Sequence, residues 1–184
     1  MARDTLSRSL HDLGLSAWFG GTLANAVALN AASKEAGSTS STGAVANVGW
    51  DRWTPMNAAA IGAHLAGSVG ELAGNKSRLA GQQGVASMAL AKTALTVAAL
   101  GVTAYSRLLG RKVSARTDVP AQDATTPAAG TPPEVASAQR KLGALQWAVP
   151  ALTGALVVVS SFAGGQQRAS EVKGGLVARL VPTR

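Results

Sequence analysis

The chain has 184 residues, of which only 14% are charged, and a formal net charge of +8. This charged fraction is well under the roughly 25% that is typical of soluble globular proteins, so an ordinary charged surface is not expected. The chain contains no Cys, which excludes disulfides, thiolate metal sites and cysteine nucleophiles.

Four long stretches of the sequence are almost free of charge. They cover residues 13–33, 53–70, 79–106 and 142–167. The exceptions within them are His64 and Lys92. A bilayer core is crossed by about 20 apolar residues, and a soluble bundle rich in Ala and Gly would instead carry a charged face on each helix. The sequence therefore predicts an all-α protein, a four-transmembrane-helix bundle with spans near 13–32, 54–73, 85–106 and 143–164.

The segments between the predicted spans differ in character. Residues 37–43 consist of Gly, Ser and Thr, which predicts a flexible exposed loop before the second span. Residues 107–141 are expected to form a flexible linker rich in Pro, Ala and Thr, and residues 168–184 a basic tail. We expect one integral membrane domain over residues 1–184.

Four tryptophans lie at or near the ends of the predicted spans and are expected to anchor them in the membrane interface. They are Trp18, Trp50, Trp53 and Trp147. Pro55 suits the first turn of a helix, which supports a second helix that starts near residue 54.

Lys and Arg residues divide evenly between the two sides of the membrane, so their bias does not set the orientation. We expect a multi-pass protein of the cell membrane with both termini in the cytoplasm, because an even number of spans with inside termini is common. The basic residues lie mostly between spans, where anionic lipid explains them, and we expect no nucleic-acid partner.

Small residues recur at every fourth position of the first two spans and would allow close helix packing. The stripes are Gly20, Ala24, Ala28 and Ala32; Ala59, Ala63 and Gly67; and Ala66, Gly70 and Gly74. The partners expected from this pattern are the lipid bilayer and either other membrane subunits or a second copy of the chain.

An intramembrane cluster of polar residues is the candidate functional site, because an ionisable group at membrane depth is by default a hypothesis for a functional site. Its members are His64, Glu71, Lys92, Asn25 and Asn57. Glu71 and His64 could exchange protons while Lys92 compensates charge. The structural alternative is that Glu71 pairs with Lys92 and that His64 only holds a neighbouring helix by a hydrogen bond.

No cofactor or metal is expected. His11 and His64 are the histidines of the chain, and helix rise places them about a dozen ångströms apart along the membrane normal, so they should not face one iron. The sequence has neither a phosphate-binding loop nor a nucleophile elbow, and we expect no catalysis. The leading interpretation is a non-enzymatic accessory or structural subunit of a membrane assembly. The alternatives are a small proton-coupled carrier and, third, a haem- or copper-binding membrane protein.

Residues 11–21 begin with His11 and contain Trp18 followed by Gly20 and Gly21. This His-x6-Trp-x-Gly-Gly pattern resembles the opening of small bacterial membrane families similar to copper-resistance protein D and its uncharacterised four-helix relatives. The resemblance implies a metal- or haem-binding histidine in the second span, for which His64 is the candidate. The composition, rich in Ala, Gly and Arg and poor in Lys, also resembles that of actinobacterial proteins.

Overall fold

A computed structural model describes residues 2–76, 84–116 and 119–165, with side chains from residue 5 to residue 164 within these ranges. The expected basic tail at 168–184 lies outside the described residues. The first helical segment comprises α1 (Ala2–Ala24), a π-helical stretch (Asn25–Leu29), α2 (Asn30–Ser33) and a short 3-10 turn (Lys34–Ala36). The other long helices are α3 (Thr39–Gly74), α5 (Val85–Ser114) and α6 (Pro133–Gly165). The prediction of an all-α protein of four helices is confirmed for the described residues.

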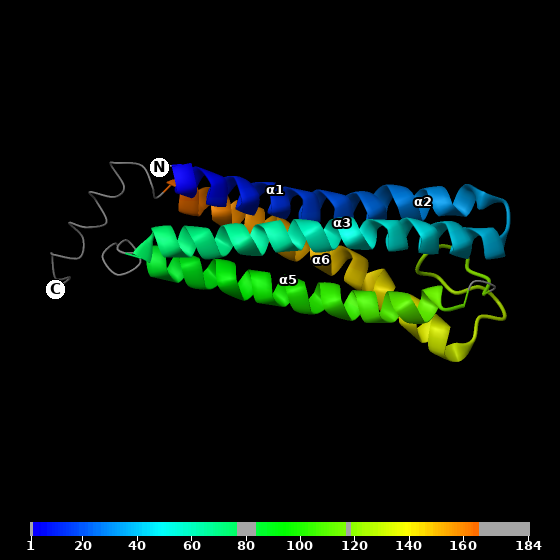
Figure 1. The fold of residues 1–184 in the computed structure, drawn as a ribbon. Coiled ribbons are helices and arrows are strands. Elements are labelled where there is room, and N and C mark those ends of the chain that lie inside the picture. The colour runs from blue at the N-terminus through cyan, green and yellow to red at the C-terminus, as the bar shows by residue number, and fades with distance from the viewer. Residues whose placement is uncertain (1, 77–83, 117–118, 166–184) are drawn as a thin grey trace, which may run out of the picture.

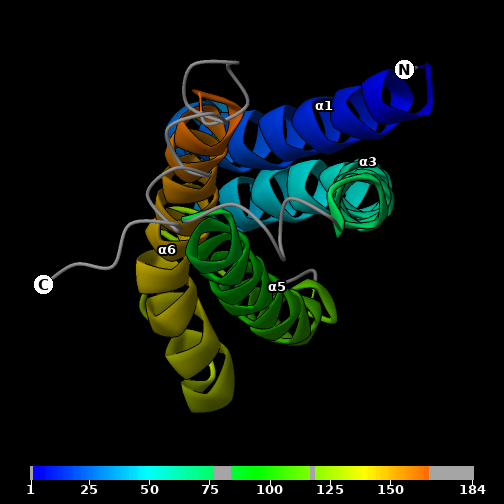
Figure 2. The same ribbon diagram turned by 90° about the vertical axis from the view of Figure 1, so that its left-hand side faces the viewer.

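The four helical segments form two antiparallel hairpins (Figure 1). The segment from α1 to α2 packs along α3, α5 packs along α6, and α6 also crosses α1 (Figure 2). Contacts between α3 and α5 are sparse. We call the end that holds the start of α1 the terminal end, and the end that holds the turn before α3 the loop end.

The helix boundaries differ from the predicted spans. Each helical segment is longer than its span, and α3 begins at Thr39 instead of near residue 54. The Ser38 side chain accepts a hydrogen bond from the backbone N–H of Ser41, and Gly37 adopts a left-handed conformation with φ of 82°, so the chain turns within two residues. Pro55 consequently lies inside α3, not in its first turn.

Two of these helices, α5 and α6, are long and apolar enough to cross a membrane. These helices are not apolar because they form a buried core. Of the 18-residue apolar stretch of each helix, only 6% is buried in α5 and 22% in α6. Helices α1 and α3 are less apolar than these stretches of α5 and α6. Their Gly, Ser, Asn and His residues lower mean hydropathy although charge is absent from 13–33 and nearly absent from 53–70.

The linker expected at 107–141 is helical at both ends, because α5 continues to Ser114 and α6 begins at Pro133. Between them, the Asp123 carboxylate accepts hydrogen bonds from the backbone N–H groups of Thr125 and Thr126, each at 2.8 Å. The backbone N–H of Ala121 donates to the carbonyl of Thr39 at 3.0 Å, which ties this loop to the start of α3. Flexibility of the connection stays a prediction.

Candidate functional site

Two glycines bring α1 and α3 into backbone contact. A Cβ atom on Gly14 would collide with the backbone of Ala60 and His64, and a Cβ atom on Gly67 would collide with the backbone of Ser7 and His11. These glycines therefore fix the register in which the two antiparallel helices meet. Of the small residues picked out in the sequence, Gly67 serves this contact.

The register places the two histidines side by side. The ring centroids of His11 and His64 lie 4.6 Å apart with the planes tilted by 49°, and the Trp18 ring lies 6.1 Å from His64. All three side chains are almost fully buried. The expected separation of the histidines along the membrane normal is therefore wrong, because α1 begins well before residue 13 and His11 lies more than two turns inside it.

The hydrogen-bond partners of His11 and His64 favour one tautomer of each ring.

 The His64 Nδ1–H donates to the backbone carbonyl of His11 at 3.4 Å, which leaves Nε2 to accept from the Thr96 hydroxyl, also at 3.4 Å. The His11 Nδ1–H donates to the Asp12 carboxylate at 2.8 Å. The His11 Nε2 atom is buried and has no hydrogen-bond partner.

The ring contact between His11 and His64 leaves no room for a porphyrin between them, so these two imidazoles do not fit axial ligation of one haem. Among the described residues, no group of three or more His, Cys, Asp or Glu side chains could hold a metal ion.

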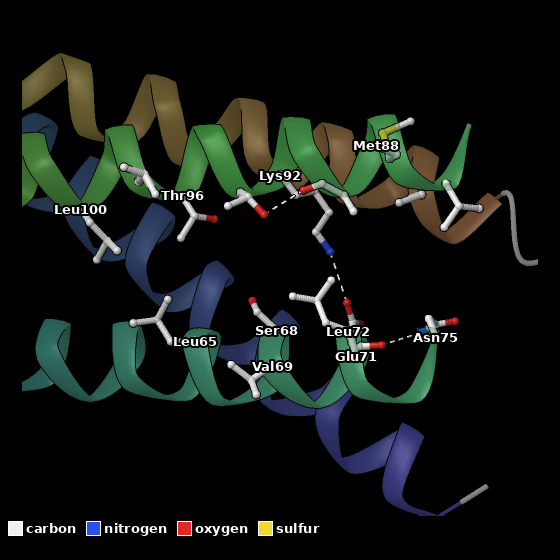
Figure 3. Close-up of a pocket in the computed structure, with 15 residues that line it drawn as sticks. Leu65, Ser68, Val69, Glu71, Leu72, Asn75, Met88, Lys92, Thr96 and Leu100 are labelled. Carbon is white, nitrogen blue, oxygen red and sulfur yellow. Dashed lines mark hydrogen bonds and ion pairs between the residues drawn. The ribbon is translucent and has the colours of Figure 1, made fainter. Parts of the chain in front are cut away.

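Glu71 and Lys92 form an ion pair that connects α3 to α5. The Lys92 Nζ atom lies 3.2 Å from Glu71 Oε2, and the two side chains are only 19% and 22% exposed. Figure 3 shows Lys92 reaching from α5 toward Glu71, whose backbone carbonyl accepts a hydrogen bond from Asn75. The structure thus brings together two members of the predicted cluster and places His64 on a separate set of partners.

A polar cavity of about 320 Å³ lies beside this ion pair at the terminal end, between α1 and α6. Its lining includes Arg8, His11, Asp12, Glu71, Lys92 and Ser160. The unpartnered atoms here are His11 Nε2 and the Ser160 hydroxyl. Sequence reasoning put His11 at a membrane edge and omitted it from the cluster; its spacing of seven residues from Trp18 is the signal that both face the same side of α1.

The two asparagines of the predicted cluster lie elsewhere. Asn25 opens the π-helical stretch and donates its side-chain N–H to the carbonyl of Gly21, within its own helix. Asn57 lines a second cavity between α3 and α5, where its Oδ1 atom has no partner. Neither asparagine is paired with Glu71 or Lys92 among the hydrogen bonds of the described residues.

The tryptophans occupy different environments. Trp18 is fully buried in a core cluster with Ala60, Ala99 and Val149, so its ring is enclosed by protein. The prediction that Trp18 lies in the membrane interface is therefore wrong. The Trp53 ring covers Gly21, where any side chain would collide with it. Trp147 is 50% exposed, and its role as an interfacial anchor stays a prediction.

Trp50 belongs to a polar relay near the loop end that sequence reasoning missed. Its Nε1–H donates to Asn30 Oδ1 at 3.0 Å, and the Asn30 side-chain amide donates to Gln146 on α6. Asn30 is buried, so this relay connects α2, α3 and α6 through a satisfied polar group. The signal in the sequence was a pair of amide side chains in uncharged stretches, Asn30 near the end of residues 13–33 and Gln146 near the start of residues 142–167.

Comparisons of the chain with protein-family models, with curated proteins and with solved structures found no match. The resemblance of residues 11–21 to the copper-resistance protein D-like families stays a prediction.

Proposed function

We propose that this chain is a four-span integral membrane protein that acts, without catalysis, as an accessory or structural subunit of a membrane assembly. The observation that carries the proposal is the exposed apolar surface of α5. A helix at the core of a soluble protein would be mostly buried, and a signal sequence would lie at the N-terminus, whereas α5 is neither. A bilayer is the simplest solvent for such a surface.

Insertion of α1 and α3 is supported by their packing. Both are long enough to cross a bilayer core and lie antiparallel to each other, with α1 against α6. The backbone contact at Gly14 and Gly67 is the kind of close helix approach that drives association in lipid. A bundle that places α5 and α6 in the bilayer would therefore carry the first hairpin with them.

A partner is supported by the exposed stripe on the first helical segment. All four of its members, Gly20, Ala24, Ala28 and Ala32, are exposed, and nothing lies within 4 Å of where a Gly20 Cβ would be. Small residues at this spacing allow another helix to approach closely. Because α3 and α6 pack on other faces of the segment, this stripe is available to a partner subunit or a second copy.

The test is purification of the tagged protein from its native membrane in mild detergent, followed by mass spectrometry of the proteins that co-elute. We expect the chain to resist a carbonate wash and to elute with a stoichiometric partner. The variant A24L/A28L should lose that partner, whereas A98L, which enlarges an exposed Ala of α5, should retain it. Release by carbonate would contradict membrane insertion, and a lone protein in detergent would contradict the subunit role.

Orientation can be tested separately, because the chain has no native Cys to remove. We propose that both termini are cytoplasmic. The variant S9C at the terminal end should then be protected from an impermeant thiol reagent in intact cells, while S40C at the loop end should be labelled. The reverse pattern would place the termini outside.

A small proton-coupled carrier is the second candidate, and the polar cavity at the terminal end favours it. A buried histidine whose Nδ1–H is held by a carboxylate presents an unpartnered Nε2 to that cavity, beside the Glu71–Lys92 pair. Substitution of Glu71, His11 and Lys92 by Ala discriminates between the candidates. An accessory subunit should still assemble with its partner, whereas a carrier should lose proton flux in vesicles.

A further inference from the structure

A cavity of about 330 Å³ lies between α3 and α5, nearer the loop end than the polar cavity. It exists because these two helices contact each other sparsely, and α6 forms its third wall through residues such as Leu145 and Val149. Its volume is at the lower end of the roughly 300–1,000 Å³ that is typical of small-molecule sites. Most of its lining is apolar.

Four of the residues that line this cavity carry a buried polar side-chain atom without a hydrogen-bond partner. Trp53 Nε1 and Asn57 Oδ1 come from α3, and the hydroxyls of Thr103 and Ser106 come from α5. Half of the unpartnered buried side-chain atoms of the described residues therefore gather in one place. Buried polar groups in proteins are nearly always paired, and such a concentration points to a ligand that pairs them.

The chemistry of these atoms restricts the ligand. Trp53 supplies a donor, Asn57 an acceptor, and the two hydroxyls can do either. The charged side chain on the wall is that of Arg107, and it is already paired with Asp51 at 2.7 Å. The ligand head should therefore be uncharged and carry both accepting and donating oxygens.

A neighbouring cavity lies farther along the same two helices. Leu100 lines both this cavity and a neighbouring one of about 300 Å³, which extends toward the terminal end past Leu65, Val69 and Val97 (Figure 3). The second cavity offers a mainly apolar path between the same two helices. An apolar tail attached to the polar head would lie there.

We propose that the space between α3 and α5 binds an uncharged amphiphile with a hydroxylated head, of which a quinol is a suitable probe, and an apolar tail. The Trp53 N–H donates to a head-group oxygen, Asn57 Oδ1 accepts from a head-group hydroxyl, and Thr103 and Ser106 complete the pairing. The tail runs past Leu100 into the neighbouring cavity. This inference does not depend on the partner subunit proposed above.

The experiment is native mass spectrometry of the full chain in detergent with decylhydroquinone as the probe. Decylbenzene has the same ring and tail without hydroxyls, and decanoate has a charged head. We expect decylhydroquinone to bind about tenfold or more tightly than either, because a pair of neutral hydrogen bonds accounts for a change of that order. Equal binding of all three would overturn the proposal, and preference for decanoate would assign the site to anionic lipid recruited by Arg107.

Variants separate the head-group contacts from general partitioning into apolar space. N57L/S106A should weaken decylhydroquinone binding about tenfold, while S106T, which keeps the hydroxyl, should bind like the native chain. S160A is the matched control, because it removes an unpartnered buried hydroxyl from the polar cavity at the terminal end.

The melting temperature without ligand should be unchanged or higher in S106A, since an unpaired polar group is removed. Full binding by N57L/S106A, or a lower melting temperature of S106A, would show that water or protein pairs these atoms instead.

Discussion

The imidazole rings of His11 and His64 lie 4.6 Å apart although the residues belong to different helices. Both rings are buried, and Trp18 extends the contact on the same face of α1. This arrangement depends on the backbone contact made by Gly14 and Gly67, since a wider spacing of α1 and α3 would separate the rings. Helices α1 and α3 are therefore joined by the contact between the two imidazole rings and by the backbone contacts at Gly14 and Gly67.

Enlarging Gly67 should separate α1 from α3. A Cβ atom at this position would overlap the backbone of His11 and Ser7, which no rotamer change can relieve. We expect G67A to lose about 1–3 kcal/mol of unfolding free energy, as measured by thermal or denaturant unfolding in detergent. G62A on the same helix is the control, because nothing lies within 4 Å of the corresponding Cβ position. Equal stability of the two variants would contradict the close contact.

The two histidines should be energetically coupled. In a double-mutant cycle of H11A and H64A, the two losses of stability should sum to more than the loss in the double variant, by about 0.5–1.5 kcal/mol. The measurement is unfolding of the four proteins in one detergent. As a reference cycle, H11A combined with L108A, far away on α5, should give additive losses. Additivity in the histidine cycle would show that the rings do not interact.

Loss of one partner of the Glu71–Lys92 pair should be more harmful than loss of both. A single substitution, E71Q or K92Q, leaves a charge about four-fifths buried without its counter-ion. We expect a loss of about 2–4 kcal/mol for each single variant, smaller than for a fully buried pair, and recovery of part of it in E71Q/K92Q. Unfolding in detergent measures all three. If the single and double variants lose the same unfolding free energy, the charge left behind in each single variant costs nothing extra. That result would mean that water solvates the pair.

Acid should weaken the loop around Asp123. Burial alone would raise the pKa of this carboxyl, but hydrogen bonds from Thr125 and Thr126, with a smaller contribution from Lys34, lower the net pKa. A pKa that is lower in the folded state stabilises the loop above the usual carboxyl pKa, and the stabilisation disappears as the pH falls through the lowered value. The protection factors of the Thr125 and Thr126 amide protons, which correct for the intrinsic pH dependence of exchange, should fall across that window. D123N should show no such pH dependence, and a native chain with a flat profile would refute the role of the carboxylate.

A charge on the exposed face of α5 should report on its solvent. Val97 is 63% exposed and lies in the uncharged part of α5 between Lys92 and Arg107, whereas Leu108, 59% exposed, directly follows Arg107 near the loop end. If lipid covers α5, V97R should reduce membrane insertion by about 2.5–3.5 kcal/mol and L108R by much less. A glycosylation-tag insertion assay measures both. Normal insertion of V97R would mean that protein or water, and not lipid, covers this face.

Much of the fold follows from local patterns in the sequence. The uncharged stretch at 142–167 predicts a long apolar helix in the region of α6, and residues 85–106 predict the core of α5, because length and hydropathy are local properties. For Glu71 and Lys92 the sequence left two alternatives open, a role in proton exchange and a structural ion pair. The structure shows the two side chains in contact. By contrast, the Ser and Thr residues at 39–42 suggested a loop, and only the cap at Ser38 together with the contact to Ala121 extends α3 through them.

Tertiary structure alone decided which residues meet. The sequence contains Gly14 and Gly67 but not the register in which they bring His11 onto His64, because register depends on contacts between residues far apart in the chain. The gathering of Trp53, Asn57, Thr103 and Ser106 around one cavity likewise depends on the spacing of α3 and α5, which no local pattern records. Composition and hydropathy thus determined the number, class and approximate place of the helices. The angles and distances between those helices determined where polar atoms lack partners, and hence where a ligand could bind.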